Sequence, residues 1–308
     1  MERRTFLTSL VALAANGSLV ARAFQQPQAG GERAVKIEKL KYNLFLLRGG
    51  GGNTAVFVTS TGAVVIDTKN PGWGQPIIDA VKTITDKPVT RIINTHTHAD
   101  HVSGNVEFPA SVDVVAHDNA RVGMEKMAPV TGMPTTVGMP HIFKEHGGKG
   151  LPKRTFKDRL TIGTGADQID LYYFGRGHTD GDAWVVFPAL RMMHAGDIFS
   201  GKGVPLLDAN NGGSGVEIGS SLAKAAAGIR GIDAIITGHD GVLTMPDLEE
   251  YVRFNDEFLA TVRNAKRAGR TIDEVVASWR MPEKYVEYGA AQPARVRSNV
   301  EVVYNELQ

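Results

Sequence analysis

The chain has 308 residues, and its 34 Lys and Arg against 33 Asp and Glu leave a formal charge of +1. Because nucleic-acid binding needs a clustered basic excess, this balance argues against a nucleic-acid partner. Hydrophobic residues at 42% and charged residues at 22% are typical of a folded globular protein, and the lack of cysteine excludes disulfides, thiolate metal ligands and a cysteine nucleophile.

The first 23 residues have the pattern of an export signal. Arg3 and Arg4 precede a short apolar run from Phe6 to Val20, and a small-residue cleavage site follows at 21–23. The segment from Arg3 to Leu7 resembles the twin-arginine signal. The alternative, an N-terminal membrane anchor, requires a longer apolar run. We therefore predict a signal peptide over 1–23, one domain over 24–308, a periplasmic or secreted location, and no stable membrane anchor after cleavage.

Hydrophobic periodicity predicts strands mixed with helices along the rest of the chain. The predicted strands cover residues 55–58, 63–66, 89–93, 112–116, 160–162, 169–174, 183–187, 192–195 and 234–237. Helical spacing or capping signals predict helices over 77–84, around 222–229, over 246–269, from Thr271 onward, and over 296–307. This mixture fits two sheets packed face to face with helices outside, an α/β sandwich, although periodicity alone leaves a doubly wound sheet open.

Four groups able to bind a metal follow the predicted strand 89–93 within six positions: His96, His98, Asp100 and His101. Crowded together, they would repel or desolvate one another unless a cation lay between them. Imidazole and carboxylate ligands without thiolate favour zinc, with iron or manganese as alternatives. The cluster therefore predicts a metal site.

Three later motifs stand at the ends of predicted strands: Gly177-His178-Thr179, Gly196-Asp197 and Gly238-His239. Together with His96-x-His98-x-Asp100-His101, and in this order, they resemble the signature of the metallo-β-lactamase-fold hydrolase superfamily. The resemblance extends from Asn53-Thr54 to His239. It implies a four-layer αββα sandwich with a dinuclear metal site at one edge, between the sheets.

The resemblance also implies a role for each of these residues. It makes His96, His98 and His178 ligands of a first metal, Asp100, His101 and His239 ligands of a second, and Asp197 a bridge between them. The implied cofactors are two Zn²⁺ ions, with Fe or Mn as alternatives. A hydroxide shared by the two metals would attack a carbonyl that they polarise, and Asp100, the predicted catalytic residue, would orient it.

The aspartate at the bridging position limits which members of the family the chain resembles. Glyoxalase II-type thioester hydrolases and lactonases have an aspartate there, as this chain has Asp197. Lactamases with a metal-binding cysteine are excluded, because the chain has no cysteine. The predicted function is hydrolysis of a small-molecule ester, lactone or β-lactam. A glyoxalase II-like thioester hydrolase and a mononuclear iron enzyme resembling the sulfur dioxygenases are the alternatives. The sequence leaves the substrate, the physiological metal and the oligomeric state open.

The remaining polar candidates each have a structural interpretation. His117, His141 and His146 are interpreted as surface or loop histidines, and turn formation explains Asp180 and Asp182. His194 either orients Asp197 or packs within its strand. The segment from Met124 to Phe156 is either a mobile lid or a connecting insertion. Lys202, Asn210 and Asn211, on a Gly-rich loop after Asp197, are candidate substrate contacts by position alone.

Overall fold

A computed structural model describes residues 33–307, so the predicted signal peptide over 1–23 lies outside the described residues. A seven-stranded sheet holds β1 Lys36–Lys41, β2 Leu44–Arg48, β3 Thr54–Val58, β4 Ala63–Ile66, β5 Val89–Ile93, β6 Asp113–His117 and β7 Arg154–Phe156, in that spatial order. Strands β1 to β4 pair antiparallel, whereas β4 to β7 pair parallel. The carboxyl ends of β4, β5 and β6 therefore lie at one edge of this sheet.

A six-stranded sheet contains β8 Arg159–Ile162, β9 Ile169–Tyr172, β10 Trp184–Phe187, β11 Met192–His194, β12 Ala234–Ile236 and β13 Val242–Leu243. Its spatial order is β13-β12-β11-β10-β9-β8. Strands β11 and β12 are parallel, and the other neighbours are antiparallel. The loops after β11 and β12 consequently leave the same edge of this sheet.

The α-helices are α1 Gly74–Ile84, α2 Ala99–Val102, α3 Asp118–Lys126, α4 Ile142–Glu145, α5 Ile218–Gly228, α6 Met245–Arg267, α7 Ile272–Ser278 and α8 Pro293–Glu306. The capping box predicted at Thr271 and Glu274 opens α7, and Thr244 with Asp247 forms a second one at the start of α6. Among residues 33–307, no helix is both long and apolar enough to cross a bilayer.

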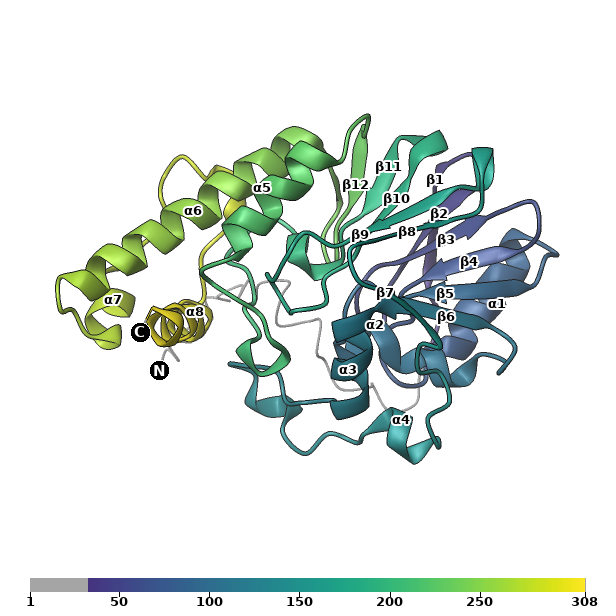
Figure 1. Cartoon of the computed structure of the whole chain (residues 1–308), viewed down its shortest axis with the longest axis horizontal. Coiled ribbons are helices and arrows are strands. Elements are labelled where there is room, and N and C mark those ends of the chain that lie inside the picture. Colours follow the sequence, from purple (N-terminus) through teal and green to yellow (C-terminus); the bar gives the residue numbers. More distant parts are fainter. Residues whose placement is uncertain (1–32, 308) are drawn as a thin grey trace, which may run out of the picture.

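The two sheets pack face to face, and helices cover their outer faces (Figure 1). Between the sheets, Phe57 of β3 packs on Phe187 of β10 with ring centroids 5.0 Å apart. On the outer face of the seven-stranded sheet, α1 packs through Ile77 and Val81. Helices α5 and α6 cover the outer face of the six-stranded sheet. The predicted αββα sandwich is confirmed, and the doubly wound alternative is wrong.

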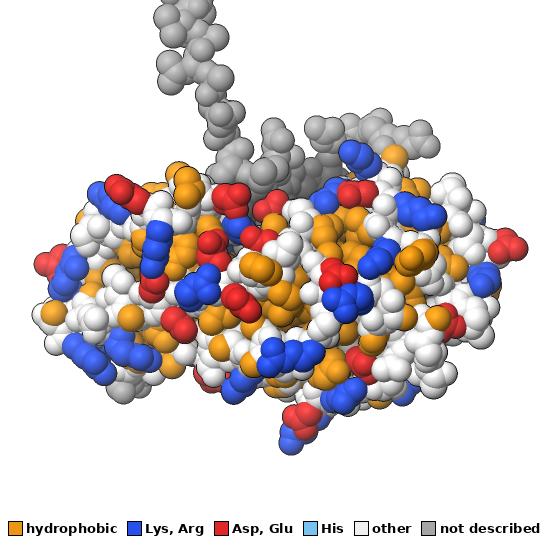
Figure 2. Space-filling view, turned by 90° about the horizontal axis from the view of Figure 1, so that it is seen from above, with side chains coloured by type: hydrophobic (Ala, Val, Ile, Leu, Met, Phe, Trp, Pro, Cys, Tyr) orange, Lys and Arg blue, Asp and Glu red, His pale blue; other side chains and the backbone are white. Residues whose placement is uncertain are grey.

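The surface carries charges of both signs. On the face seen in Figure 2, Lys and Arg side chains are interspersed with Asp and Glu. This distribution agrees with the near-zero net charge of the sequence. No basic stripe of the kind that tracks a phosphate backbone gathers on that described face.

Candidate metal centre

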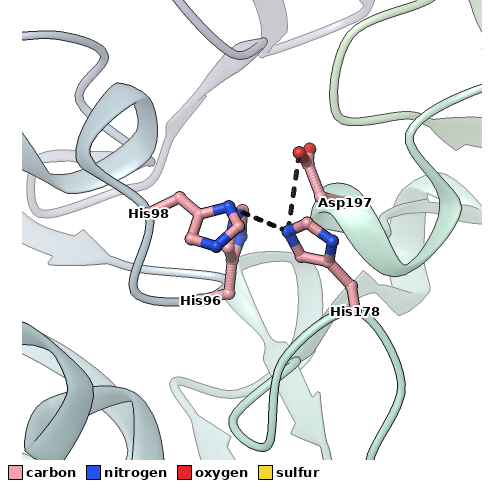
Figure 3. Close-up of side chains that lie close together, drawn as sticks. All are labelled: His96, His98, His178 and Asp197. Atoms are coloured by element: carbon pink, nitrogen blue, oxygen red, sulfur yellow. Dashed lines mark hydrogen bonds and ion pairs between the residues drawn. The ribbon is translucent and has the colours of Figure 1, made fainter. Parts of the chain in front are cut away.

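Loops from both sheets bring the predicted ligands together at one edge of the sandwich. The turn after β5 carries His96, His98, Asp100 and His101, and the loop between β9 and β10 carries His178. Asp197 follows β11 and His239 follows β12. Figure 3 shows the three side chains His96, His98 and His178 converging with Asp197. Their ligand atoms all lie within 4.8 Å of one another, and those of Asp100, His101 and His239 form a second such group.

The hydrogen bonds of His96 fix which of its nitrogens is free. Thr95 donates its hydroxyl proton to Asp67 Oδ2 at 2.7 Å, so the Thr95 oxygen can only accept from His96 Nδ1–H, at 3.0 Å. The other nitrogen, His96 Nε2, therefore carries a lone pair. It is buried and has no hydrogen-bond partner among the described residues.

His98 and His178 present lone pairs to each other. His98 Nε2 donates to Asp208 Oδ2 at 2.7 Å, and His178 Nδ1 donates to the Leu206 carbonyl at 2.8 Å. The unprotonated nitrogens, His98 Nδ1 and His178 Nε2, then face each other at 3.0 Å. Burial, with the neighbouring His98, lowers the pKa of His178 to about 3, so this ring is neutral at pH 7. Two facing lone pairs repel unless a proton or a cation lies between them.

The second group is built from Asp100, His101 and His239. His101 Nδ1 donates to Asp67 Oδ2 at 2.7 Å, which leaves His101 Nε2 facing His239 Nε2 at 3.3 Å. Asp100 Oδ2 lies 3.4 Å from His239 Nε2, and both oxygens of Asp100 are buried without a hydrogen-bond partner. Burial alone would lower the pKa of His101, but Asp197, Asp100 and Asp67 together raise it well above its usual value. The field of these carboxylates favours positive charge at this position.

Asp197 lies between the two groups. Its Oδ2 is 3.7 Å from His178 Nε2 in the first group and 3.1 Å from His239 Nε2 in the second, and its Oδ1 is 3.2 Å from His101 Nε2. Burial alone would raise the pKa of Asp197, but His239 and His101 outweigh it and hold that pKa well below its usual range. An ionised carboxylate therefore stands where it can contact cations in either group.

The donor set fits a metal centre. Imidazole nitrogens and carboxylate oxygens converge here, and His96 Nε2, both oxygens of Asp100 and Asp197 Oδ1 are buried without a hydrogen-bond partner among the described residues, which is costly unless a cation compensates them. Nitrogen and oxygen donors without thiolate are those that zinc, iron and manganese accept. Both groups predicted from the sequence are present, and the structure brings all seven predicted residues together.

Two further carboxylates that the sequence analysis did not single out hold the histidines in place. Asp67, fully buried after β4, binds Thr95 and His101. It stands at a strand end like the predicted ligands, so the same signal could have identified it. Asp208 is fully buried beside His98 but lies on an irregular loop, and no local pattern marks it. Such partners orient the ring and raise the basicity of the nitrogen opposite.

Asp208→Asn tests this orienting role. Burial alone would raise the pKa of Asp208, but hydrogen bonds from His98 and the Thr131 amide hold it well below its usual range. The neutral amide would lose the charge-assisted bond to His98. We expect metal affinity at the three-histidine group to fall by about 10- to 100-fold, measured by competition with a chelator. Asp170→Asn, which removes a buried carboxylate charge within β9, provides the control and should leave affinity unchanged.

Several other predicted residues occupy different environments. His117, interpreted as a surface or loop residue, is buried, stacks on Tyr173 and donates to the Lys157 carbonyl, so that interpretation is wrong. His194 bonds to the Asn53 carbonyl and the Gly196 amide, which fits a packed strand residue. Lys202 is held in ion pairs with Asp247, Glu250 and Glu287.

The remaining candidates stabilise local structure. His141 caps the start of α4, and His146 bonds to the Ile142 carbonyl one turn earlier. Asp182 accepts hydrogen bonds from Thr179 within the turn, as predicted. The side chains of Asn210 and Asn211 donate to backbone carbonyls of 128–129, so they tie their loop to the segment after α3.

Comparison with known proteins identifies the family. Residues 47–239 match the model of the metallo-beta-lactamase superfamily. The chain therefore belongs to this superfamily. A metallo-beta-lactamase type 2 from Elizabethkingia meningoseptica is 28% identical over 177 residues, which span 53% of this chain and 62% of that relative. The match thus covers less than two thirds of that relative's own length.

Two solved structures share the fold. A metallo-beta-lactamase from Pontibacter korlensis superposes with a TM-score of 0.57 at 18% identity, covering 72% of this chain and 99% of that one. A sec-alkylsulfatase from Pseudomonas sp. superposes with a TM-score of 0.66 at 14% identity, covering 88% of this chain and 50% of that one. At these identities the likeness concerns the fold alone.

Proposed function

We propose that the protein is a hydrolase that binds two metal ions and cleaves a small ester, lactone or β-lactam. The observation that carries this proposal is the convergence of two groups of imidazole and carboxylate donors on a shared carboxylate. His96 Nε2, His98 Nδ1 and His178 Nε2 would hold one ion, and Asp100, His101 and His239 the other. Asp197, between the groups, would contact both ions.

The chemistry divides between the ions and the protein. When bound, such ions lower the pKa of water and polarise a substrate carbonyl. Asp100 has two buried oxygens without hydrogen-bond partners, so one can hold a cation while the other accepts a hydrogen bond from the attacking water. Asp67 and Asp208 keep His101 and His98 in the tautomers that this arrangement requires. No serine or cysteine nucleophile is needed.

The alternative is a mononuclear iron enzyme, and enzymes of that class keep the same ligand motifs while binding one iron. Both groups are complete among the described residues, so the metal content of the protein separates the two functions. The fold alone does not identify the substrate, because proteins with this fold include a lactamase and a sulfatase. The proposal therefore rests on the donor atoms rather than on the name of any relative.

Metal analysis combined with a hydrolysis screen tests the proposal. We expect about two zinc ions per chain after dialysis, and turnover of at least one ester, lactone or β-lactam that a chelator abolishes and zinc restores. Thioesters are included in the screen to detect a glyoxalase II-like activity. One iron per chain, without hydrolysis of any of these classes, would refute the proposal.

We also propose export of the protein from the cytoplasm as an already folded chain. The support is the sequence of residues 1–23, with Arg3 and Arg4 before a short apolar run. Fractionation of producing cells provides the test. The mature protein should be in the periplasm or medium, and a cytoplasmic, full-length product would contradict the export signal.

A further inference from the structure

A cavity of about 290 Å³ lies beside the metal centre, and His98 belongs to both. One wall is the turn after β5, from Thr97 to Ser103, and the opposite wall is the segment from Met127 to Glu145. Helix α3 precedes this segment and lies next to α2 in Figure 1, and α4 forms the end of the segment. Because the cavity reaches a predicted metal ligand, a molecule bound there would lie next to the reacting atoms.

The walls are mainly apolar. Most of the apolar lining comes from the segment after α3, through Met127, Ala128, Val130, Met139, Pro140 and Ile142. A cavity of about 150 Å³ suffices for a benzene ring, so the volume here accommodates one ring with a substituent. Apart from His98, the only ionisable residue in the lining is Glu145, so no Lys or Arg there would bind an anion.

Two hydroxyl groups of the turn after β5 are closed off from the cavity. Thr97 is 4% exposed and Ser103 is 1% exposed, and both hydroxyl oxygens are buried without a hydrogen-bond partner among the described residues. Thr136, which also lines the cavity, is already bonded to the Val130 amide and the Met133 carbonyl. The hydroxyl groups of the lining residues are therefore either closed off or already bonded, so the cavity favours a group that needs few hydrogen bonds.

The wall after α3 is fixed to the metal centre by hydrogen bonds. The Thr131 amide donates to Asp208 Oδ1, and the other oxygen of Asp208 accepts from His98. The Asn210 amide donates to Thr131 Oγ1 at 2.9 Å. Asp208 thus binds both the segment that forms this cavity wall and the ring of His98, a predicted metal ligand.

We propose that this cavity is the substrate pocket for a neutral aromatic group. The assignment of substrate rests on the proposed hydrolase function, whereas binding of such a group does not. The apolar walls hold the ring. Benzyl esters should then be cleaved with a higher kcat/KM than methyl esters of the same acid, because the two alcohols are about equally good leaving groups and differ in the ring.

Calorimetry with benzamide and acetamide as probes tests the pocket on the metal-loaded protein. Both amides can contact the metals, so their difference isolates the ring. Benzamide should bind saturably and acetamide at least about tenfold more weakly. Ala128→Phe fills the cavity and should weaken benzamide binding by about tenfold or more.

Two variants on one exposed stretch keep the test independent of folding. Met139 is 43% exposed and lines the cavity, whereas Val137 is 68% exposed and does not. Met139→Ser should weaken benzamide binding about threefold, while Val137→Ser should leave it unchanged. Equal binding of the two amides, or unchanged benzamide binding in Ala128→Phe and Met139→Ser, would overturn the pocket.

The same variants separate this inference from the proposed function. If Ala128→Phe loses benzamide binding but still hydrolyses the smallest substrate found in the screen, both stand. If wild-type protein binds benzamide in the cavity but hydrolyses nothing, the pocket stands and the proposed function fails. If the protein hydrolyses a substrate but binds benzamide and acetamide equally, the proposed function stands and the pocket fails.

Discussion

Asp197→Ala should lose most of its second metal and reduce hydrolysis by at least about a hundredfold. Replacing a residue that only orients a metal ligand already lowers metal affinity or activity by up to about a hundredfold. Asp197 lies between both groups, so its loss should have at least this effect. Without its carboxylate, two neighbouring cations would lack their shared anion and repel each other more strongly. The second ion, left with Asp100, His101 and His239, should dissociate first. Elemental analysis after dialysis measures the metal content.

The fold should survive this substitution. Asp197 stands on a short 3-10 helix, Gly196–Phe199, beyond β11, and the core between the sheets is formed by other residues. Asp170→Asn provides a matched control, because it removes a buried carboxylate charge within β9, away from both metal groups. The control should keep two metals and near-normal turnover. An Asp197→Ala protein that retains two tightly bound ions and wild-type rates would refute the bridging role.

The metal centre was predictable because its residues follow apolar strands. The strands 63–66 and 89–93 have the predicted bounds, and each ends in polar residues that the fold brings to one edge. Strand β1, Lys36–Lys41, was not predicted, because it is an edge strand with charged and partly exposed side chains. Its pattern lacks the apolar run that marks a buried strand.

Other features depend on contacts between distant parts of the chain. Asp208 becomes important only because Thr131 and His98, 77 and 110 residues away, meet it in the fold. His117 has the sequence context of a loop residue, but Tyr173 and the Lys157 carbonyl bury it. The cavity wall likewise combines the turn after β5 with residues beyond α3. Hydrophobic periodicity reports on single elements, so it carries no information about these pairings.

Gly238→Ala should disable the metal centre while leaving every predicted ligand in the chain. A Cβ atom at this glycine would lie 1.8 Å from Asp197 Oδ1 and 2.8 Å from the Gly196 carbonyl. The backbone here cannot easily move away, because the Gly238 carbonyl accepts a hydrogen bond from the Asn53 amide at 2.7 Å. The Asp197 side chain must therefore leave its position between the two groups. We expect metal content and hydrolysis to fall nearly as far as in Asp197→Ala.

Gly241→Ala separates this steric effect from a general loss of glycine. Nothing lies within 4 Å of a Cβ atom built at Gly241, three residues further along the same loop. This control should keep both metals and full activity, whereas Gly238→Ala should also lose about 1–3 kcal/mol of unfolding free energy through overpacking. Chelator competition and chemical denaturation measure the two quantities. If Gly238→Ala retains two metals with wild-type affinity, Asp197 can hold them from a displaced position. The close packing of Gly238 against the Asp197 carboxylate would then not be what positions this side chain.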